Sequence, residues 1–243
     1  MGNRFLRKTP ADKLVYKLVT KTVIENRLIE DGDRILLACS GGKDSTVLAW
    51  ALSSIKSALK INYELMALHI STDFCSCCKK GILEKTLNGW GIPFTDLDVP
   101  VIGRLKPGRK MNCYWCSTQR RTELLSFACA RNFNKIALGH HLDDMIETFF
   151  MNMTRKGTFE TMPVMLSYRK YPVKLIRPLA LIEEKEVITC AEKLDITKAV
   201  CTCPYGVNSG RKEIRKKLIS LTDDSGAVKR RILSAINRKV SLE

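Results

Sequence analysis

A short apolar run that ends directly in a glycine-rich turn is the feature that most constrains how this chain can fold. The run, residues 35–39 (ILLAC), has the length of a strand and the continuous apolar character of a strand covered on both faces. The turn SGGKDS follows at residues 40–45, and a segment with helical spacing extends to about Leu59. Strand, turn and helix in this order predict the first unit of a sheet in which parallel strands alternate with helices.

The same alternation continues along most of the chain. Further strands are expected at residues 65–70, 93–99, 135–138 and 173–176, and helices at 11–30, 44–59, 80–89, 117–131, from about 143, and 183–194. A loop that ends at Cys113 is expected before the helix at 117–131, and a basic helical segment from Arg211 onward. The predicted fold class is therefore α/β, with a doubly wound parallel sheet and a basic C-terminal helical segment.

The charge balance points to a polyanionic partner. The 243 residues carry 41 Lys and Arg against 25 Asp and Glu, which gives a formal net charge of +16. Nucleic acid is the leading candidate for so basic a surface, and 45% apolar residues exclude a mainly disordered chain. No apolar run approaches the roughly 18 residues of a membrane span, and the N-terminal residues lack the apolar core of a secretory signal. We therefore expect a cytoplasmic protein without a membrane partner.

The turn after the first strand has the composition of a phosphate-binding loop. Its residues are Ser40, Gly41, Gly42, Lys43, Asp44 and Ser45. Glycines let the backbone approach an anion, the following helix N-terminus presents free N–H groups, and the lysine neutralises phosphate charge. A Walker loop is excluded because it requires Ser or Thr after the lysine, where this chain has Asp44. Ser40 and Ser45 are candidate hydrogen-bond donors, and Asp44 is a candidate Mg²⁺ ligand.

A second polar motif follows the fourth expected strand and opens the next helix. It reads Gly139, His140, His141, Leu142, Asp143 and Asp144. The carboxyl ends of neighbouring parallel strands meet at one edge, so this motif is expected beside the phosphate loop. Two adjacent carboxylates there suit Mg²⁺, whereas neighbouring histidines on a helix point about 100° apart and chelate one metal poorly. Helix capping explains one of the acids but not the whole motif.

The ten cysteines indicate metal binding or thiol chemistry, because no export signal accompanies them. Three groups are tight: Cys75, Cys77 and Cys78; Cys113 and Cys116; Cys201 and Cys203. The two-residue spacer between Cys113 and Cys116 suits chelation, and the last group adds candidate ligands. Four ligands predict structural zinc, and three predict an iron–sulfur cluster with one open iron. The first group is assigned no role, and Cys39, Cys129 and Cys190 are expected to be small core residues.

Longer stretches of the sequence resemble a known enzyme family. SGGKDS resembles the pyrophosphate loop of the N-type ATP pyrophosphatases, which cleave ATP to AMP and pyrophosphate while adenylating a substrate. Residues 113–121 (CYWCSTQRR), 136–148 (IALGHHLDDMIET), 162–163 (MP) and 176–179 (IRPL) resemble, in order, the tRNA 2-thiocytidine synthetase family of these PP-loop proteins. The likeness, from about Ile29 to Leu218, implies an N-terminal helical segment (1–30), a PP-loop domain with iron–sulfur cysteines (31–200), and a third-cysteine segment with basic helices for tRNA (201–243).

The resemblance also implies which residues form the site. The ATP-binding positions of the family map to Ser40, Gly41, Gly42, Lys43, Asp44, Ser45, His69 and Gly139. Its catalytic positions map to Lys43, Asp143, Asp144 and Arg120, with one of the two aspartates at the Mg²⁺ of ATP and Arg120 near the α-phosphate. The [4Fe–4S] cluster of the family is bound by a CxxC and one later cysteine, which map to Cys113, Cys116 and Cys203. The chain has CxC where the family often has a later CxxC, so Cys201 stays an alternative to Cys203.

The implied reaction is thiolation of a tRNA base. The oxygen at C2 of a pyrimidine attacks the α-phosphate of ATP, pyrophosphate leaves, and sulfur then replaces the adenylated oxygen with release of AMP. The family favours cytidine 32 of the anticodon loop, and the absence of N-terminal cysteines favours its cytidine branch over the uridine branch. The implied partners are tRNA, held by the basic C-terminal helices with Arg104 and Arg109, and a sulfur donor such as a cysteine desulfurase persulfide or sulfide. A homodimer is compatible with the family, whose members are commonly dimeric.

Three alternatives stay open. A tRNA 2-thiouridine synthetase would share the architecture and act on a uridine. Another PP-loop tRNA-modifying ligase, such as one that joins lysine to a cytidine, would need ATP but no cluster, and the CxxC with a third cysteine argues against it. A zinc-stabilised RNA-binding module would use Cys113, Cys116, Cys201 and Cys203 as four ligands, and the intact SGGKDS with paired aspartates argues against it.

Overall fold

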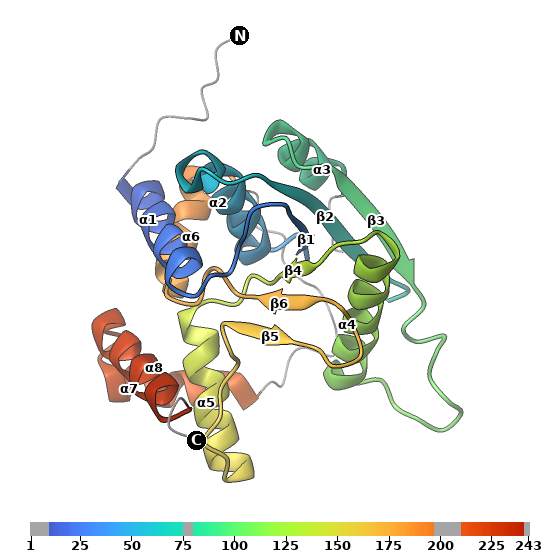
Figure 1. Cartoon of the computed structure of the whole chain (residues 1–243). Helices are drawn as coiled ribbons and strands as arrows, with labels where there is room; N and C mark the ends of the chain where they lie inside the picture. Colours follow the sequence, from blue (N-terminus) through green and yellow to red (C-terminus); the bar gives the residue numbers. More distant parts are fainter. Residues whose placement is uncertain (1–9, 75–79, 197–209, 241–243) are drawn as a thin grey trace.

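The computed structural model describes residues 10–74, 80–196 and 210–240. Its centre is a six-stranded sheet in the order β3-β2-β1-β4-β6-β5 (Figure 1). The strands are β1 (Asp33–Ala38), β2 (Tyr63–Thr72), β3 (Phe94–Val99), β4 (Lys135–Ala137), β5 (Met165–Ser167) and β6 (Lys174–Ile176). The helices are α1 (Pro10–Glu25), α2 (Lys43–Leu59), α3 (Lys80–Gly89), α4 (Cys113–Ala130), α5 (Leu142–Lys156), α6 (Glu184–Lys193), α7 (Gly210–Thr222) and α8 (Gly226–Val240).

The sheet is parallel except at one edge. β1 pairs in parallel with β2 and β4, and β3 and β6 extend the parallel array on either side. The predicted α/β fold with a doubly wound parallel sheet is therefore confirmed. β5 runs antiparallel to β6 and was not predicted. It lies at the edge of the sheet and, unlike β4 and β6, has no fully buried residue.

Alternate residues of the central strands face two separate cores. Ile35 and Leu37 join one core with α1, α2 and α6, whereas Leu36 joins the other beneath α4. Residues 35–39 are continuously apolar because a strand covered on both faces needs apolar side chains at every position. Cys39 and Cys190 are buried in the first core as predicted, and Cys129 is half-buried beside the second.

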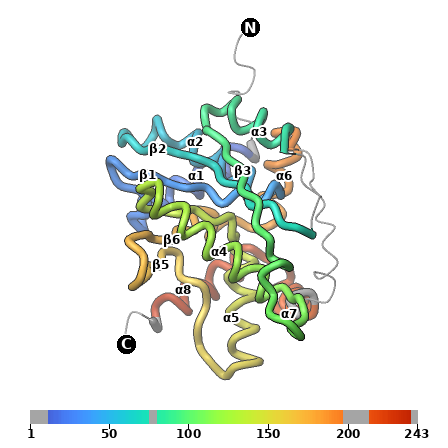
Figure 2. Tube along the Cα trace, turned by 90° about the vertical axis from the view of Figure 1, so that its right-hand side faces the viewer, coloured from blue at the N-terminus to red at the C-terminus, as the bar shows by residue number. Residues whose placement is uncertain are grey.

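The C-terminal helices α7 and α8 form a third apolar cluster against α5. Leu218 of α7 and Leu233 of α8 pack there with Met145 and Phe149 of α5. Figure 2 shows α3 and α5 at opposite ends of the molecule with the sheet between them. Within the part of the chain that the structure describes, no helix has both the length and the apolar character of a membrane span.

Candidate active site

The chain reverses its winding direction between β1 and β4. From β1 it proceeds outward through β2 to β3, and it then returns to the other side of β1 as β4. In doubly wound sheets, ligands bind in the crevice outside the carboxyl ends of the strands at such a switch point. The phosphate loop follows β1, and the motif at residues 139–144 follows β4. The topology therefore brings the two predicted motifs to the same edge.

The phosphate loop leads directly into the N-terminus of α2. Gly41 has a φ of +80°, a conformation that side chains disfavour, and Gly42 is extended with no side chain capping the helix. The Ser45 hydroxyl donates to the Gly42 carbonyl at 3.0 Å and lies 3.2 Å from the hydroxyl of Ser40. The loop thus leaves N–H groups of the first turn open toward an anion.

Gly139 fits against this loop because it has no side chain. A Cβ at this position would lie 3.0 Å from the carbonyl carbon of Asp44 and 3.0 Å from the backbone nitrogen of Ser45. Backbone atoms cannot swing aside as the end of a flexible side chain can. Gly139, predicted at the ATP site, therefore allows direct contact between the loop after β4 and the start of α2.

Lys43 is held between two carboxylates. Its Nζ lies 3.0 Å from Asp44 Oδ1 and 3.0 Å from Glu184 Oε1. Burial alone would lower the pKa of Lys43, but the two carboxylates outweigh it, and this pKa lies above its ordinary value. Oε2 of Glu184 in turn lies 2.8 Å from Arg215 Nη1 on α7. A phosphate that binds Lys43 must therefore compete with Glu184, a residue that the sequence analysis did not identify.

Asp44 presents a buried carboxylate oxygen that accepts no hydrogen bond. This oxygen, Oδ1, lies beside the Lys43 ammonium and 4.0 Å from His141 Nε2. Among the described residues, no three or more His, Cys, Asp or Glu side chains converge into a metal site. Mg²⁺ commonly takes one or two carboxylates and completes its shell with phosphate oxygens and water. The residues present therefore fit Mg²⁺ carried in with a nucleotide rather than a metal held by protein groups alone.

The paired aspartates stabilise two different helix starts. Asp143 accepts the backbone N–H of Glu184 at 2.7 Å and the ammonium of Lys229 on α8 at 2.7 Å. Burial raises the pKa of Asp143, but these hydrogen bonds outweigh it and the pKa is lowered. Asp144 accepts the backbone N–H of His141 at 3.2 Å, which caps α5. Asp143 therefore links the candidate site to the C-terminal helices.

A cavity of about 270 Å³ opens beside the phosphate loop. Its polar lining comes from Ser40, Ser117, Arg120, Arg121 and His140, and its apolar lining from side chains of β1, β2, β4, β6 and α4. His69 does not line it: the ring is 2% exposed, and its Nδ1 lies 2.7 Å from the Cys39 carbonyl and donates to it. Burial lowers the pKa of His69, and the charge of Arg120 adds to this effect, so the ring is neutral.

Two arginines of α4 line the cavity without a carboxylate partner. Neither Arg120 nor Arg121 forms an ion pair within residues 10–74, 80–196 and 210–240. Their charges act instead on uncharged or cationic neighbours, since Arg120 lowers the pKa of His69 and Arg121 lowers that of Arg177. A cavity with uncompensated positive charge and an apolar wall favours an anionic ligand with an apolar part.

The CxxC pair lies in the first turn of α4. The sequence predicted a loop ending at Cys113 and a helix from about 117, but the helix begins at Cys113 because the Asn112 side chain accepts the Trp115 N–H at 2.9 Å and caps it. Cys113 is exposed and Cys116 half-buried, and residues three apart share a helix face. Two metal ligands therefore fit here. The candidate third ligand, Cys203, its alternative Cys201, and the unassigned Cys75, Cys77 and Cys78 lie outside the described residues.

The basic C-terminal helices contain two kinds of cation. Arg215 contacts Glu147, which is 1% exposed, and Lys229 contacts Asp143. Burial opposes the charge of Lys229, but its carboxylate partners outweigh it and raise the pKa. Exposed cations without a carboxylate partner in the described part of the chain are Lys216, Arg231 and Arg238. Part of the basic run thus attaches the helices to the domain, and tRNA binding by these helices stays a prediction that concerns the exposed cations.

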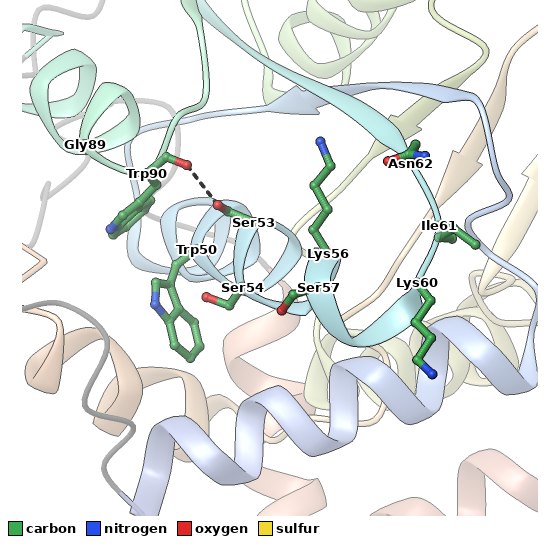
Figure 3. Close-up of a pocket in the computed structure, with 10 residues that line it drawn as sticks. All are labelled: Trp50, Ser53, Ser54, Lys56, Ser57, Lys60, Ile61, Asn62, Gly89 and Trp90. Atoms are coloured by element: carbon green, nitrogen blue, oxygen red, sulfur yellow. Dashed lines mark hydrogen bonds between the residues drawn. The ribbon is translucent and has the colours of Figure 1, made fainter. Parts of the chain in front are cut away.

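A larger hollow, about 640 Å³, lies at the other end of α2. Figure 3 shows Trp50 and Lys56 of α2 together with Lys60 and Trp90 from the segments after α2 and α3. This hollow is at the amino end of β2, and none of the predicted site residues lines it. Ligand sites in doubly wound sheets lie at the opposite, carboxyl edge, so we place the active site at the smaller cavity.

The chain is similar to known proteins over most of its length. A family model described as a PP-loop domain matches residues 13–222. The tRNA-cytidine(32) 2-sulfurtransferase of Syntrophotalea carbinolica is 34% identical over 228 residues, which are 91% of this chain and 87% of that protein. The protein of the same name from Geobacter sulfurreducens is 32% identical over 230 residues, 92% of this chain and 89% of that protein.

A solved structure shares the fold over nearly the whole chain. It is the U34-tRNA thiolase NcsA from Methanococcus maripaludis with its [4Fe–4S] cluster, which superposes with a TM-score of 0.79 at 25% identity. The match covers 95% of this chain and 79% of that chain. With the family model and the two curated relatives, these matches show that the chain belongs to the PP-loop family and, within it, to the tRNA 2-thiocytidine synthetase family that its motifs resemble.

Proposed function

We propose that this PP-loop enzyme is an ATP-dependent tRNA sulfurtransferase that replaces the oxygen at C2 of cytidine 32 with sulfur. The observation that carries the proposal is the shared cavity of about 270 Å³. Ser40 of the phosphate loop lines it, and so does Ser117, the residue directly after Cys116 of the CxxC pair. A phosphate loop and the helix that carries the cysteine pair, both lining one cavity, suit a reaction in which ATP activates the base that then receives sulfur.

In the first step, the C2 oxygen of the base bonds to the α-phosphorus of ATP and pyrophosphate leaves. Lys43 exchanges Glu184 for a phosphate oxygen and neutralises the leaving pyrophosphate. Asp44 Oδ1, buried and accepting no hydrogen bond, is the candidate protein ligand for the Mg²⁺ of ATP. Arg120 faces the cavity without a carboxylate partner among the described residues and neutralises charge at the α-phosphate.

The cysteines are the proposed ligands of an iron–sulfur cluster. Cys113 and Cys116 share one face of the first turn of α4, and Cys203 is the proposed third ligand. A [4Fe–4S] cluster held by three cysteines supplies one iron with an open position for sulfur. The positive end of the α4 dipole favours negative charge beside the two cysteines. The proposed sulfur donor is sulfide or a persulfide of a cysteine desulfurase, and AMP leaves when sulfur bonds to C2. Sulfide gives the thiolated base directly, whereas a persulfide also requires a thiol that reduces the S–S bond.

The proposed tRNA contacts are exposed cations that have no carboxylate partner within the described residues. They include Lys216, Arg231 and Arg238 on α7 and α8 and Arg109 in the loop before α4. Phosphate contacts of this kind bind RNA without reading its sequence. The target base must leave its stack to reach the cavity, which favours a nucleotide in a single-stranded loop.

The first test combines metal analysis with an assay of the product. Protein purified without oxygen is assayed for iron, sulfide and zinc as wild type and as Cys113→Ala, Cys116→Ala, Cys201→Ala and Cys203→Ala. Four irons per chain, lost in all variants except Cys201→Ala, are expected for a three-cysteine cluster. Mass spectrometry of tRNA after incubation with ATP and sulfide is expected to detect 2-thiocytidine. Zinc alone, lost with any of the four substitutions, would contradict the proposal and favour the zinc-stabilised RNA-binding module.

A second candidate substrate is the wobble uridine. The observation that favours it is the 0.79 TM-score to a protein named as a U34-tRNA thiolase. The two candidates separate in one experiment, in which tRNA carrying C32 but not U34 is compared with tRNA carrying U34 but not C32. We expect tRNA-dependent pyrophosphate release only with the first.

A further inference from the structure

A buried arginine lies behind the wall of the active-site cavity. Arg177 follows β6 and is 5% exposed. Its Nε donates to His140 Nδ1 at 3.2 Å, and its Nη1 donates to the carbonyl of Pro163. In the described part of the chain, no carboxylate lies within ion-pair distance of this guanidinium. A buried charge without a countercharge is costly, so its retention requires a reason.

The electrostatics of Arg177 agree with this geometry. Burial lowers the pKa of Arg177 to about 10, and the nearby charge of Arg121 contributes to the lowering. The guanidinium is still protonated at neutral pH. Its position next to Arg121, rather than next to an acid, adds to the positive charge around the cavity instead of cancelling it.

The hydrogen bond from Arg177 fixes the tautomer of His140. A guanidinium can only donate, so His140 Nδ1 must accept and carries no proton. The proton of the neutral ring is therefore on Nε2, which can only donate. His140 lines the cavity together with Arg120 and Arg121. The wall thus combines three donors, one of them an imidazole whose tautomer is fixed by Arg177 behind it.

We propose that Arg177 is a positioning residue that fixes His140 as a donor to the phosphate of the adenylate. The Nε2–H of His140 then binds a phosphate oxygen of AMP or of its ester with the base, and this phosphate supplies the countercharge that Arg177 lacks. His140 does not act as a general base, because Nδ1 accepts the hydrogen bond from Arg177 and Nε2 already carries the proton. The choice of AMP rests on the proposed function, whereas the need for an anion rests on the charges around the cavity.

The test compares ligands that differ only by the phosphate. Dissociation constants of AMP and adenosine are measured by calorimetry on the full-length protein for the wild type, Arg177→Met, His140→Asn and His140→Gln. Glutamine places an amide donor near the position of Nε2, whereas asparagine does not reach it. Arg177→Met and His140→Asn are each expected to lose one charge-assisted hydrogen bond to the phosphate. The dissociation constant of AMP is therefore expected to rise about tenfold or more. Adenosine binding is expected to stay unchanged, and His140→Gln to keep most of the AMP affinity.

A matched control is Arg34→Met. Arg34 is a partly exposed arginine at the amino end of the central strand β1, where it pairs with Glu64 at 2.8 Å. Its replacement is expected to leave both dissociation constants unchanged. Thermal unfolding of every variant shows whether it folds, and the two His140 variants test the proposal even where Arg177→Met does not fold.

Three outcomes would overturn the inference. Equal losses of AMP and adenosine affinity would reduce Arg177 to a structural role. Equal AMP affinities of His140→Asn and His140→Gln would show that a donor at the position of Nε2 does not bind the phosphate. Unchanged AMP affinity with weakened, salt-dependent tRNA binding would assign the anion to the RNA backbone. Failure of the proposed function is separate, since it would appear as a wild type that distinguishes AMP from adenosine but forms no thiolated base.

Discussion

Cations in two regions of the molecule have opposite surroundings. Around the cavity beneath α4, Arg120, Arg121 and Arg177 have no carboxylate partner among the described residues. Between α5, α6 and the C-terminal helices, Arg215 and Lys229 each contact two carboxylates within 3 Å. Charge in the first region is available to a ligand, and charge in the second is used by the fold. Net charge alone therefore overstates the number of cations that can bind nucleic acid. The presence or absence of a carboxylate partner distinguishes cations that stabilise the fold from those that can bind a ligand.

The largest expected effect on stability is that of Lys229→Met. This change removes the cation that neutralises Asp143, and both side chains are largely buried. Breaking a buried pair on one side predicts a loss of about 3 kcal/mol in the free energy of unfolding. Urea denaturation measures it, and Arg231→Met on the same helix is the control, with an expected change within about 0.5 kcal/mol. Equal effects of the two substitutions would contradict the distinction between paired and unpaired cations.

Arg120→Met is expected to show the reverse behaviour. Arg120 has no carboxylate partner among the described residues, so its removal leaves no unpaired charge there. The free energy of unfolding is therefore expected to change by less than about 0.5 kcal/mol. The rate of tRNA-dependent pyrophosphate release is expected to fall about a hundredfold, because a preorganised cation at the reacting phosphate is lost. A stability loss as large as that of Lys229→Met would show that Arg120 has a structural partner instead.

Glu184→Gln tests a residue that belongs to both regions. Glu184 pairs with Lys43 at the phosphate loop and with Arg215 on α7. Without its charge, Lys43 is released to phosphate, and we expect ATP to bind several-fold more tightly. Arg215 loses one partner, at a cost of about 1 kcal/mol in the free energy of unfolding. Calorimetric titration with Mg-ATP measures the first effect, and weaker ATP binding would instead make Glu184 part of the metal site.

The smallest expected effect is a pH dependence from His69. Its pKa is lowered in the folded protein by burial, so the unfolded chain binds a proton that the folded chain resists. The free energy of unfolding is therefore expected to fall as pH decreases below about 6.5, and to be level with respect to this group above it. His69→Asn keeps a donor near the Cys39 carbonyl but does not titrate. An unchanged slope between pH 5 and 7 in this variant would assign the dependence to other groups.

Local patterns were sufficient for most of the fold. The run at residues 35–39, the glycines after it and the spacing of α2 depend on neighbours in sequence, and the structure has β1, the phosphate loop and α2 there. The early start of α4 also had a local signal, because Asn112 is a good helix cap. It was missed because the first turn, with two cysteines and a half-buried Trp115, has no apolar periodicity.

The pairing of charges was beyond what the sequence reveals. Glu184 meets Lys43 across 141 positions, and Lys135 in β4 is 2% exposed because Asp33 lies 2.6 Å away. Neither lysine differs locally from an exposed one. The sequence gives no sign that Arg177 is buried, because its burial depends on where Pro163 and His140 lie once the sheet has formed. Such contacts follow from topology, which sequence patterns specify only through the order of elements.

The bare backbone of Gly139 also has a consequence for the order of folding. The start of α2 touches this residue across almost a hundred positions of sequence, and the contact exists only once β4 has paired with β1. Contacts between distant parts of a chain form late, because loop closure must come first. Nucleotide affinity would therefore be acquired late in folding, after the central strands have paired. A chain whose synthesis has stopped before residue 139 would contain the complete SGGKDS segment but would not bind ATP.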